Sequence, residues 1–207
     1  MEGAFFTSAF YPPGGTLKGI VVNKLGKRFI NEDVYHSRSA GALFEQPDHV
    51  GYLIMDSETM TTPKYKFQPL VDGWDTIEEM ESALGMPEGA LVETMTEYNE
   101  HAASGEDAEF HKATEWVVPL DKGPWGAYDL TPGKAFYAGF TLGGLKVSKD
   151  GEVLTADDVV VPGVYAVGAT ASNIAIDASG YSSGTQLGEA SYFGRRAGRH
   201  AAGRREG

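Results

Sequence analysis

The sequence contains no cysteine, which excludes disulfide scaffolds, thiol catalysis and cysteine-ligated zinc sites. It also contains no apolar run that approaches the roughly 20 residues needed to cross a bilayer, so we expect no membrane span. Basic residues are few, since 17 Lys and Arg stand against 29 Asp and Glu, a formal charge of −12. This balance argues against nucleic acid and anionic membranes as partners.

Targeting and metal-binding signals are also absent. The first residues lack the basic region of a signal peptide, and we therefore expect a cytoplasmic protein. The five histidines are scattered along the chain, with no pair at i, i+4. The sequence therefore predicts no metal site.

Glycine, by contrast, is abundant. The chain has 27 glycines among 207 residues, well above the roughly 7% average, and they are clustered. Clustered glycines indicate backbone held close to a ligand or to another stretch of backbone. The length suits one large or two small domains with a core of their own. The predicted secondary structure changes near residue 139. Strands, loops and a helical stretch are mixed before it, and Gly-rich strands, turns and a final helix follow it.

The region before residue 139 contains local sequence signals for strands and helices. The short apolar runs 19–23 and 27–31 flank a Gly-containing turn and predict a β-hairpin. Residues 51–56 predict another strand. Thr76, with a glutamate three residues later, has the pattern of a capping box and predicts a helix start. Pro87 predicts the start of a second helix.

The region after residue 139 contains local sequence signals of the same kind. Residues 143–147 and 152–154 flank an Asp-Gly turn and predict a β-hairpin. Residues 164–167 are largely apolar and predict a buried strand. A final helix is predicted from near Gly184 to about Ala202, with small or apolar residues at helical spacing.

The segment 177–188 is the most informative for chemistry. It places four hydroxyl side chains among three glycines just before the predicted start of the last helix: Ser179, Tyr181, Ser182 and Ser183. A helix start offers unpaired N–H groups and a partial positive charge, which suits an anion or a ring that becomes anionic when reduced. The alternative is an ordinary Gly/Ser loop that caps a helix.

A second polar segment covers residues 28–36. It holds one cation, an amide, two carboxylates, a phenol and an imidazole within nine positions. We interpret the run as a solvated strand end. Tyr35 and His36 are its groups that could move a proton, although a phenol needs a relay partner or a lowered pKa to act as a base near neutral pH.

Four segments together resemble one flavoprotein family. These are G-I-V-V-N-x-x-G-K-R-F-x-N-E over 19–32, T-L-G-G-L over 141–145, P-G-V-Y-A-V-G over 162–168, and the run 180–198. Their order and spacing resemble the fumarate reductase/3-ketosteroid dehydrogenase family, and within it the 3-ketosteroid dehydrogenases of the Δ4-(5α) and Δ1 types. The likeness covers nearly the whole chain.

The resemblance implies a fold and a cofactor. It implies an α+β cap (catalytic) domain over residues 1–138, and over residues 139–207 the C-terminal segment of an α/β FAD-binding domain of the Rossmann-like, glutathione-reductase type. The family binds FAD through an N-terminal β-α-β unit with G-x-G-x-x-G, a motif that this sequence lacks. We therefore expect a missing N-terminal FAD-binding segment or a partner chain to supply it.

The resemblance also implies roles for individual residues in the dehydrogenation of a steroid-like small molecule. Tyr35 would take the proton, and Tyr181 and Ser183 would bind the keto oxygen or relay the proton. Cofactor contacts are implied for two groups of residues: Gly168, Ala169 and Thr170 at the ribityl-phosphate part, and Gly184, Gln186 and Leu187 at the flavin ring.

Two alternatives stay open. One is a fumarate reductase-like flavoprotein that acts on an unsaturated acid. Against it, the resemblance places His36 where those enzymes carry an arginine, and residues 138–140 contain no histidine. The other alternative is a non-catalytic fragment that lacks the FAD phosphate-binding motif and works on no substrate.

Overall fold

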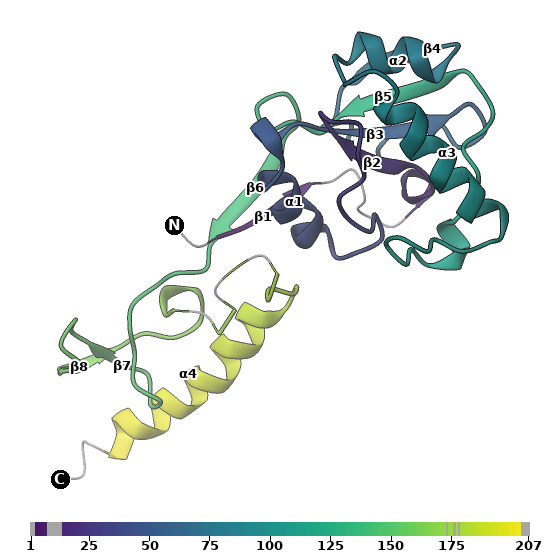
Figure 1. Cartoon of the computed structure of the whole chain (residues 1–207). Helices are drawn as coiled ribbons and strands as arrows, with labels where there is room; N and C mark the ends of the chain where they lie inside the picture. Colours follow the sequence, from purple (N-terminus) through teal and green to yellow (C-terminus); the bar gives the residue numbers. More distant parts are fainter. Residues whose placement is uncertain (1–2, 8–13, 173, 176, 178, 204–207) are drawn as a thin grey trace. The chain divides into compact units, whose positions relative to one another are not determined.

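The computed structural model describes residues 3–7, 14–172, 174–175, 177 and 179–203. The chain divides into two compact units, Phe6–Ala138 and Met1–Phe5 with Gly139–Gly207. β1 (Gly3–Thr7) and β6 (Tyr137–Thr141) form a two-stranded sheet (Figure 1). Each unit is described below by itself.

The Phe6–Ala138 unit is built on a four-stranded antiparallel sheet. The strand order is β2-β3-β5-β4, with every neighbouring pair antiparallel. The strands are β2 (Ile20–Asn23), β3 (Gly51–Asp56), β4 (Leu70–Trp74) and β5 (Trp125–Asp129). Every residue of β2 and β3 is buried, which means that both faces of this part of the sheet are covered.

Side chains alternate along each strand, so successive residues enter cores on opposite faces of the sheet, and helices cover both faces. Ile20 and Ile54 point into a core formed with α2 (Ile77–Ala83) and α3 (Ala90–Ala103). Val21 and Leu53 point to the opposite core, which includes Leu43 of α1 (His36–Phe44). Short 3-10 turns connect these elements: Gly15–Lys18, Pro47–His49 and Thr114–Trp116.

The helix starts follow local signals in part. The Thr76 hydroxyl accepts a hydrogen bond from the Glu79 amide at 3.1 Å, which confirms the predicted cap of α2. The second helix begins at Ala90, three residues after Pro87. Its start is capped from a distance, because the buried Glu81 carboxylate accepts from the Leu91 amide at 2.7 Å and from a neighbouring glycine amide.

The predicted hairpin over residues 19–31 forms only in part. Asn23 opens a tight turn that closes on Lys27, and one isolated bridge joins Val22 to Arg28. The second apolar run is not a strand, and the strand neighbour of β2 is β3. The prediction missed that Arg28 and Glu32, in the second run and just after it, belong to a buried network of charged side chains.

The other unit carries a small hairpin and one long helix. Strands β7 (Glu152–Leu154) and β8 (Val160–Tyr165) pair antiparallel, and α4 runs over Thr185–Gly203 (Figure 1). The Asp-Gly turn of the hairpin predicted over 143–154 is confirmed: Gly151 has φ +82°, and its amide donates to the Ser148 carbonyl at 2.9 Å. The first arm of that hairpin is not a strand; it forms one isolated bridge, from Val147 to Val153, and β7 has β8 as its strand partner. The final helix is confirmed as well.

The prediction of a buried strand at 164–167 was wrong. Val164 is 45% exposed, and β8 ends at Tyr165. Among the described residues β8 pairs only with β7, so the other edge of β8 has no strand neighbour there. An apolar run by itself does not tell which neighbours will cover it.

No helix within the described ranges is long and apolar enough to cross a membrane.

Candidate functional site

One carboxylate orders the Gly/Ser segment that precedes α4. Asp177 Oδ1 accepts hydrogen bonds from the Ser179 amide at 2.9 Å, the Ser179 hydroxyl at 2.6 Å and the Gly180 amide at 3.0 Å. The Ser179 hydroxyl and these amides lower the pKa of Asp177, so the carboxylate is charged at neutral pH. Asp177 thereby fixes the turn that leads into Tyr181.

Tyr181 and Ser183 lie at the end of this segment. Tyr181 is buried, and its ring packs edge-on against Phe140 of β6, with the ring centroids 4.9 Å apart. Ser183, two residues later, is exposed. The local fold therefore holds the Tyr181 ring in place and leaves the Ser183 residue at the surface, immediately before the helix.

The start of α4 offers backbone donors. Gly184 has φ +93°, and the first helical hydrogen bond at this end runs from the Gly188 amide to the Gly184 carbonyl. The amides of Gln186 and Leu187 precede that bond, so they have no acceptor within the helix. The helix dipole adds partial positive charge at the same end. This end of α4 can hold a ligand that is negative or becomes negative.

The turn Gly168–Thr170 approaches α4 closely. Gly168 has φ +61°, and a Cβ at this position would lie 2.9 Å from the Ala190 Cβ, so only glycine fits there. Ala169 and Thr170 next to it are exposed. A small cavity of about 110 Å³ adjoins Gly168. Its other lining residues include Val147, Ala166, Ser172, Glu189 and Phe193.

Tyr35 belongs to the other unit, at the N-cap of α1. Its carbonyl accepts from the amides of Arg38 and Ser39 at 2.8 and 3.3 Å. Its ring lies 4.2 Å from the ring of His36, tilted by 40°. Burial lowers the pKa of His36, so a neutral imidazole faces the Tyr35 ring at neutral pH.

The polar segment 28–36 continues into a buried charge cluster, which we define as Arg28, Glu32, Asp107 and Lys112. Arg28 donates to Glu32 Oε2 at 2.9 Å and to Asp107 through two hydrogen bonds of 2.8 and 2.9 Å. Lys112 Nζ lies 3.0 Å from Glu32 Oε2. All four side chains are at most 1% exposed. Two positive and two negative charges thus balance inside the fold.

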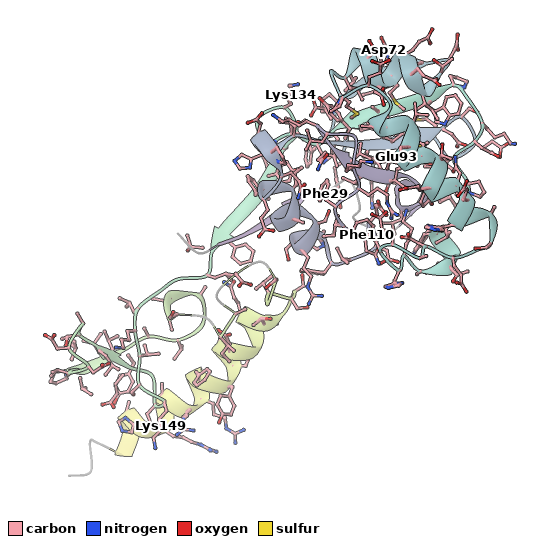
Figure 2. The ribbon with its side chains drawn as sticks, in the orientation of Figure 1. Phe29, Asp72, Glu93, Phe110, Lys134 and Lys149 are labelled. Carbon is pink, nitrogen blue, oxygen red and sulfur yellow. The ribbon has the colours of Figure 1, made fainter. Side chains whose placement is uncertain are left out.

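Aromatic rings enclose the same cluster. The Arg28 guanidinium lies 4.8 Å from the ring centre of Phe110, which is labelled in Figure 2, and 5.0 Å from that of Tyr98. Burial disfavours the charge on Glu32 and Asp107, but the neighbouring cations outweigh it and hold both pKa values below the usual range. Burial lowers the pKa of Lys112, although the negative charge of the neighbouring Glu32 acts to raise it.

The interpretation of residues 28–36 as a solvated strand end was therefore wrong for Arg28 and Glu32. The i, i+4 spacing of these two residues was visible in the sequence and is compatible with an ion pair. Their partners Asp107 and Lys112 lie about 80 residues further along the chain. No local pattern connects the two segments.

The predicted site residues thus fall into two groups. The structure brings together Tyr181, Ser183 and the start of α4 along one stretch of chain, and it brings Gly168 against α4. Tyr35 lies in the other unit. Among the described residues there is no group of three or more His, Asp or Glu that could hold a metal ion.

A flavin dinucleotide fits the features of the Gly139–Gly207 unit in two respects. The start of α4 supplies amides with no acceptor inside the helix and a positive dipole end, which suit the ring of a reduced flavin. Gly144 bears on the second: a Cβ there would lie 2.4 Å from the Ala171 carbonyl and 2.7 Å from the Thr170 carbonyl oxygen, so a glycine lets the backbone pack directly against the Gly168–Thr170 turn that would lie at the cofactor. The residues that would hold the group are Gly168, Ala169, Thr170, Gly184, Gln186 and Leu187.

Comparison with known proteins gives a family match. The family model described as "FAD binding domain" matches residues 2–189. The solved structure of 3-ketosteroid-Δ4-(5α)-dehydrogenase from Rhodococcus jostii RHA1 is similar, with a TM-score of 0.81 and 37% identity; the match covers 97% of this chain and 41% of that one.

Curated relatives point to the same group of flavoproteins. The 4-oxocyclohex-2-ene-1-carboxylate 5-dehydrogenase of Sinomonas cyclohexanicum is 31% identical over 88% of this chain and 36% of its own length. The NADH:fumarate oxidoreductase of Klebsiella pneumoniae is 29% identical over 91% of this chain and 20% of its own. The chain thus spans well under half the length of these relatives. The resemblance to this flavoprotein family is confirmed, as is FAD as the family's cofactor.

Proposed function

The chain belongs to the FAD-binding domain family, and on that premise we propose that it is part of a flavoenzyme that dehydrogenates a 3-ketosteroid next to its ketone. The observation that carries the proposal is the likeness to the Δ4-(5α)-dehydrogenase over 97% of the chain. A CH–CH dehydrogenase of this kind needs a base, donors to a keto oxygen and a hydride acceptor. The chain offers candidates for the first two.

The two units would divide the work. Residues 1–138 would form the cap that covers the substrate, and residues 139–207 would complete the FAD-binding domain. The division into two compact units supports this assignment. The G-x-G-x-x-G fingerprint for the FAD phosphates is not in this sequence, so we propose that a segment outside these 207 residues, or a partner chain, contributes it.

The chemistry would begin at the ketone. A carbonyl acidifies the neighbouring C–H, and hydrogen bonds to its oxygen stabilise the negative charge that develops there. Tyr181 and Ser183 would donate these hydrogen bonds, with Phe140 holding the Tyr181 ring. Tyr35 would take the proton at its phenol oxygen while its own proton passes to a relay partner. FAD, when bound, supplies the acceptor for the hydride from the next carbon.

The C-terminal unit would also bind the flavin. The amides of Gln186 and Leu187, with Gly184 just before them, would face the end of the ring that gains negative charge on reduction. Gly168, Ala169 and Thr170 would lie at the ribityl-phosphate part. Two of these three residues are exposed, which leaves them accessible to a ligand.

The first experiment measures flavin binding. The 207-residue protein is incubated with FAD, freed of excess cofactor, and examined by visible absorption, alone and with the N-terminal FAD-binding segment of a relative. We expect a retained flavin band only in the mixture. A mixture that never retains flavin would contradict the proposal and favour a fragment without catalytic function.

The second experiment tests the tyrosines in the flavin-loaded enzyme. We expect Tyr35→Phe to reduce turnover of a 3-ketosteroid by about 10²- to 10⁴-fold, the range of general acid–base contributions. We expect Tyr181→Phe to reduce it by about 10²- to 10³-fold, the range for loss of one donor to a developing oxyanion. Tyr192→Phe is the matched control, because Tyr192 is 61% exposed on α4. Wild-type turnover in both test variants would refute the assignment.

A second candidate function is the reduction of an unsaturated acid. The similarity to the fumarate oxidoreductase favours it. The two functions separate in one assay series, in which fumarate and related acids are compared with 3-ketosteroids as substrates of the same preparation. Turnover of the acids alone would replace the first proposal by the second.

A further inference from the structure

We propose that the loop from Asp107 to Ala113 is a clamp that positions Tyr35, and that Asp33 is the residue through which it acts. We define the clamp as the contacts that Asn31 and Asp33 make with this loop. The inference rests on the proposed role of Tyr35 as the base. It adds a positioning residue that neither the sequence patterns nor the family match indicated.

The contacts of the clamp lie directly before Tyr35. The Ala113 amide donates to Asp33 Oδ2 at 2.6 Å, and Asn31 Nδ2 donates to the His111 carbonyl at 3.1 Å. The Asp33 amide donates back to Asn31 Oδ1 at 2.8 Å. Two side chains thus tie the turn at 31–34 to the loop, and Tyr35, the N-cap of α1, follows directly after that turn.

The loop is itself anchored in the core, so it can serve as a fixed point. Asp107 accepts from the Lys112 amide at 3.2 Å through its carboxylate and from the His111 amide at 2.9 Å through its carbonyl. Its carboxylate also holds Arg28, which is buried. The loop therefore moves only if the buried charge cluster moves with it.

The chain before the clamp is fixed by the same cluster. Glu32 Oε1 accepts from the Val21 amide of β2 at 2.9 Å, and Lys112 Nζ donates to the Gly19 carbonyl at 2.7 Å. Sheet, turn and loop thus form one connected frame, and Tyr35 follows directly after the turn in the chain. Asn31 and Asp33 are only partly buried, so losing one of them loosens the turn without unfolding the unit.

This arrangement predicts an effect on the chemical step and not on substrate binding. A displacement of about 1 Å of a reacting group costs up to about 10²-fold in rate. We therefore expect Asp33→Ala to lower kcat by about 10- to 100-fold and to leave KM within about twofold. Asp33→Asn keeps an oxygen that accepts from the Ala113 amide, so we expect it to restore most of kcat.

The clamp itself is tested without any substrate. Amide hydrogen exchange of the 207-residue chain is followed by mass spectrometry in peptides that cover residues 34–39. We expect exchange at least about 10-fold faster in Asp33→Ala and close to wild type in Asp33→Asn. Glu115→Ala is the matched control, because it removes one exposed carboxylate from the adjoining turn. Unchanged exchange in Asp33→Ala overturns the clamp.

The kinetic arm uses the flavin-loaded enzyme, and the outcomes separate. If Asp33→Ala speeds exchange but leaves kcat and its pH profile unchanged while Tyr35→Phe is impaired, the positioning role is overturned and the proposed function stands. If the wild-type enzyme turns over no 3-ketosteroid, the proposed function fails, and the exchange data alone decide whether the clamp exists. Loss of kcat with unchanged KM, rescued by Asn, supports both.

Discussion

Replacing Glu32 by glutamine should destabilise the Phe6–Ala138 unit strongly. Glu32 Oε1 accepts from the Val21 amide at 2.9 Å and from Arg28 Nε at 3.2 Å. Oε2 accepts from Arg28 Nη2 at 2.9 Å and faces Lys112 Nζ at 3.0 Å. Glu32→Gln turns one of these two oxygens into an NH₂ group. In either orientation a donor then faces two other donors.

The magnitude follows from burial. The Glu32 and Lys112 side chains are 0% exposed, so neither water nor salt compensates for the lost charge. Removing one partner of a buried ion pair costs about 3–5 kcal/mol, because an uncompensated charge stays inside. With a urea m-value of about 2 kcal/mol/M for a unit of this size, the unfolding midpoint should fall by about 2 M.

Tryptophan fluorescence is the assay. The chain has three tryptophans, and Trp74, Trp116 and Trp125 all lie in the Phe6–Ala138 unit, so the signal follows that unit alone. Glu93→Gln is the matched control. It removes the same charge from an ion pair with Lys27 in which both side chains are at least 46% exposed, and such pairs contribute little. A Glu32→Gln midpoint within about 0.5 M of the Glu93→Gln midpoint would refute the argument.

Three further predictions follow from the same structure. Asp107 and Glu32 have pKa values in the folded state that lie below their values in the unfolded state. The stability that they contribute is therefore present above about pH 4 and should be lost as the pH falls from there towards the folded-state pKa values. Urea unfolding midpoints at pH 7, 5 and 3 measure this loss. Gly151→Ala should destabilise the Gly139–Gly207 unit by about 1–3 kcal/mol, since Gly151 has φ +82° and its added Cβ would lie 2.9 Å from an α4 alanine. The loss of stability should appear as faster proteolysis of α4. Gly198→Ala is the control, because its added Cβ meets no atom within 4 Å, and it should leave the proteolysis rate unchanged. Thr76→Ala should cost about 1 kcal/mol through loss of the α2 cap, with Thr76→Ser close to wild type in urea denaturation.

Local chemistry in the sequence determined several elements by itself. Thr76 caps α2, and Gly151 closes the tight turn that begins at Ser148. Each depends on residues within four positions of one another, and short-range patterns specify such features. The family resemblance rests on the same kind of information, namely short motifs in a fixed order. It led to FAD, which the family match confirms, whereas the roles of Tyr35 and Tyr181 stay predictions.

The tertiary structure decided what is buried and what those residues touch. Arg28 and Glu32 carry charges, and a charged segment by itself predicts exposure to water. They are buried because Asp107 and Lys112, about 80 residues away in the sequence, lie beside them in the folded chain. A buried charge is tolerable only with an opposite charge beside it, and only the folded chain brings the two together. For the same reason Val164 of β8 is exposed: its environment depends on neighbours that the strand's own sequence does not specify.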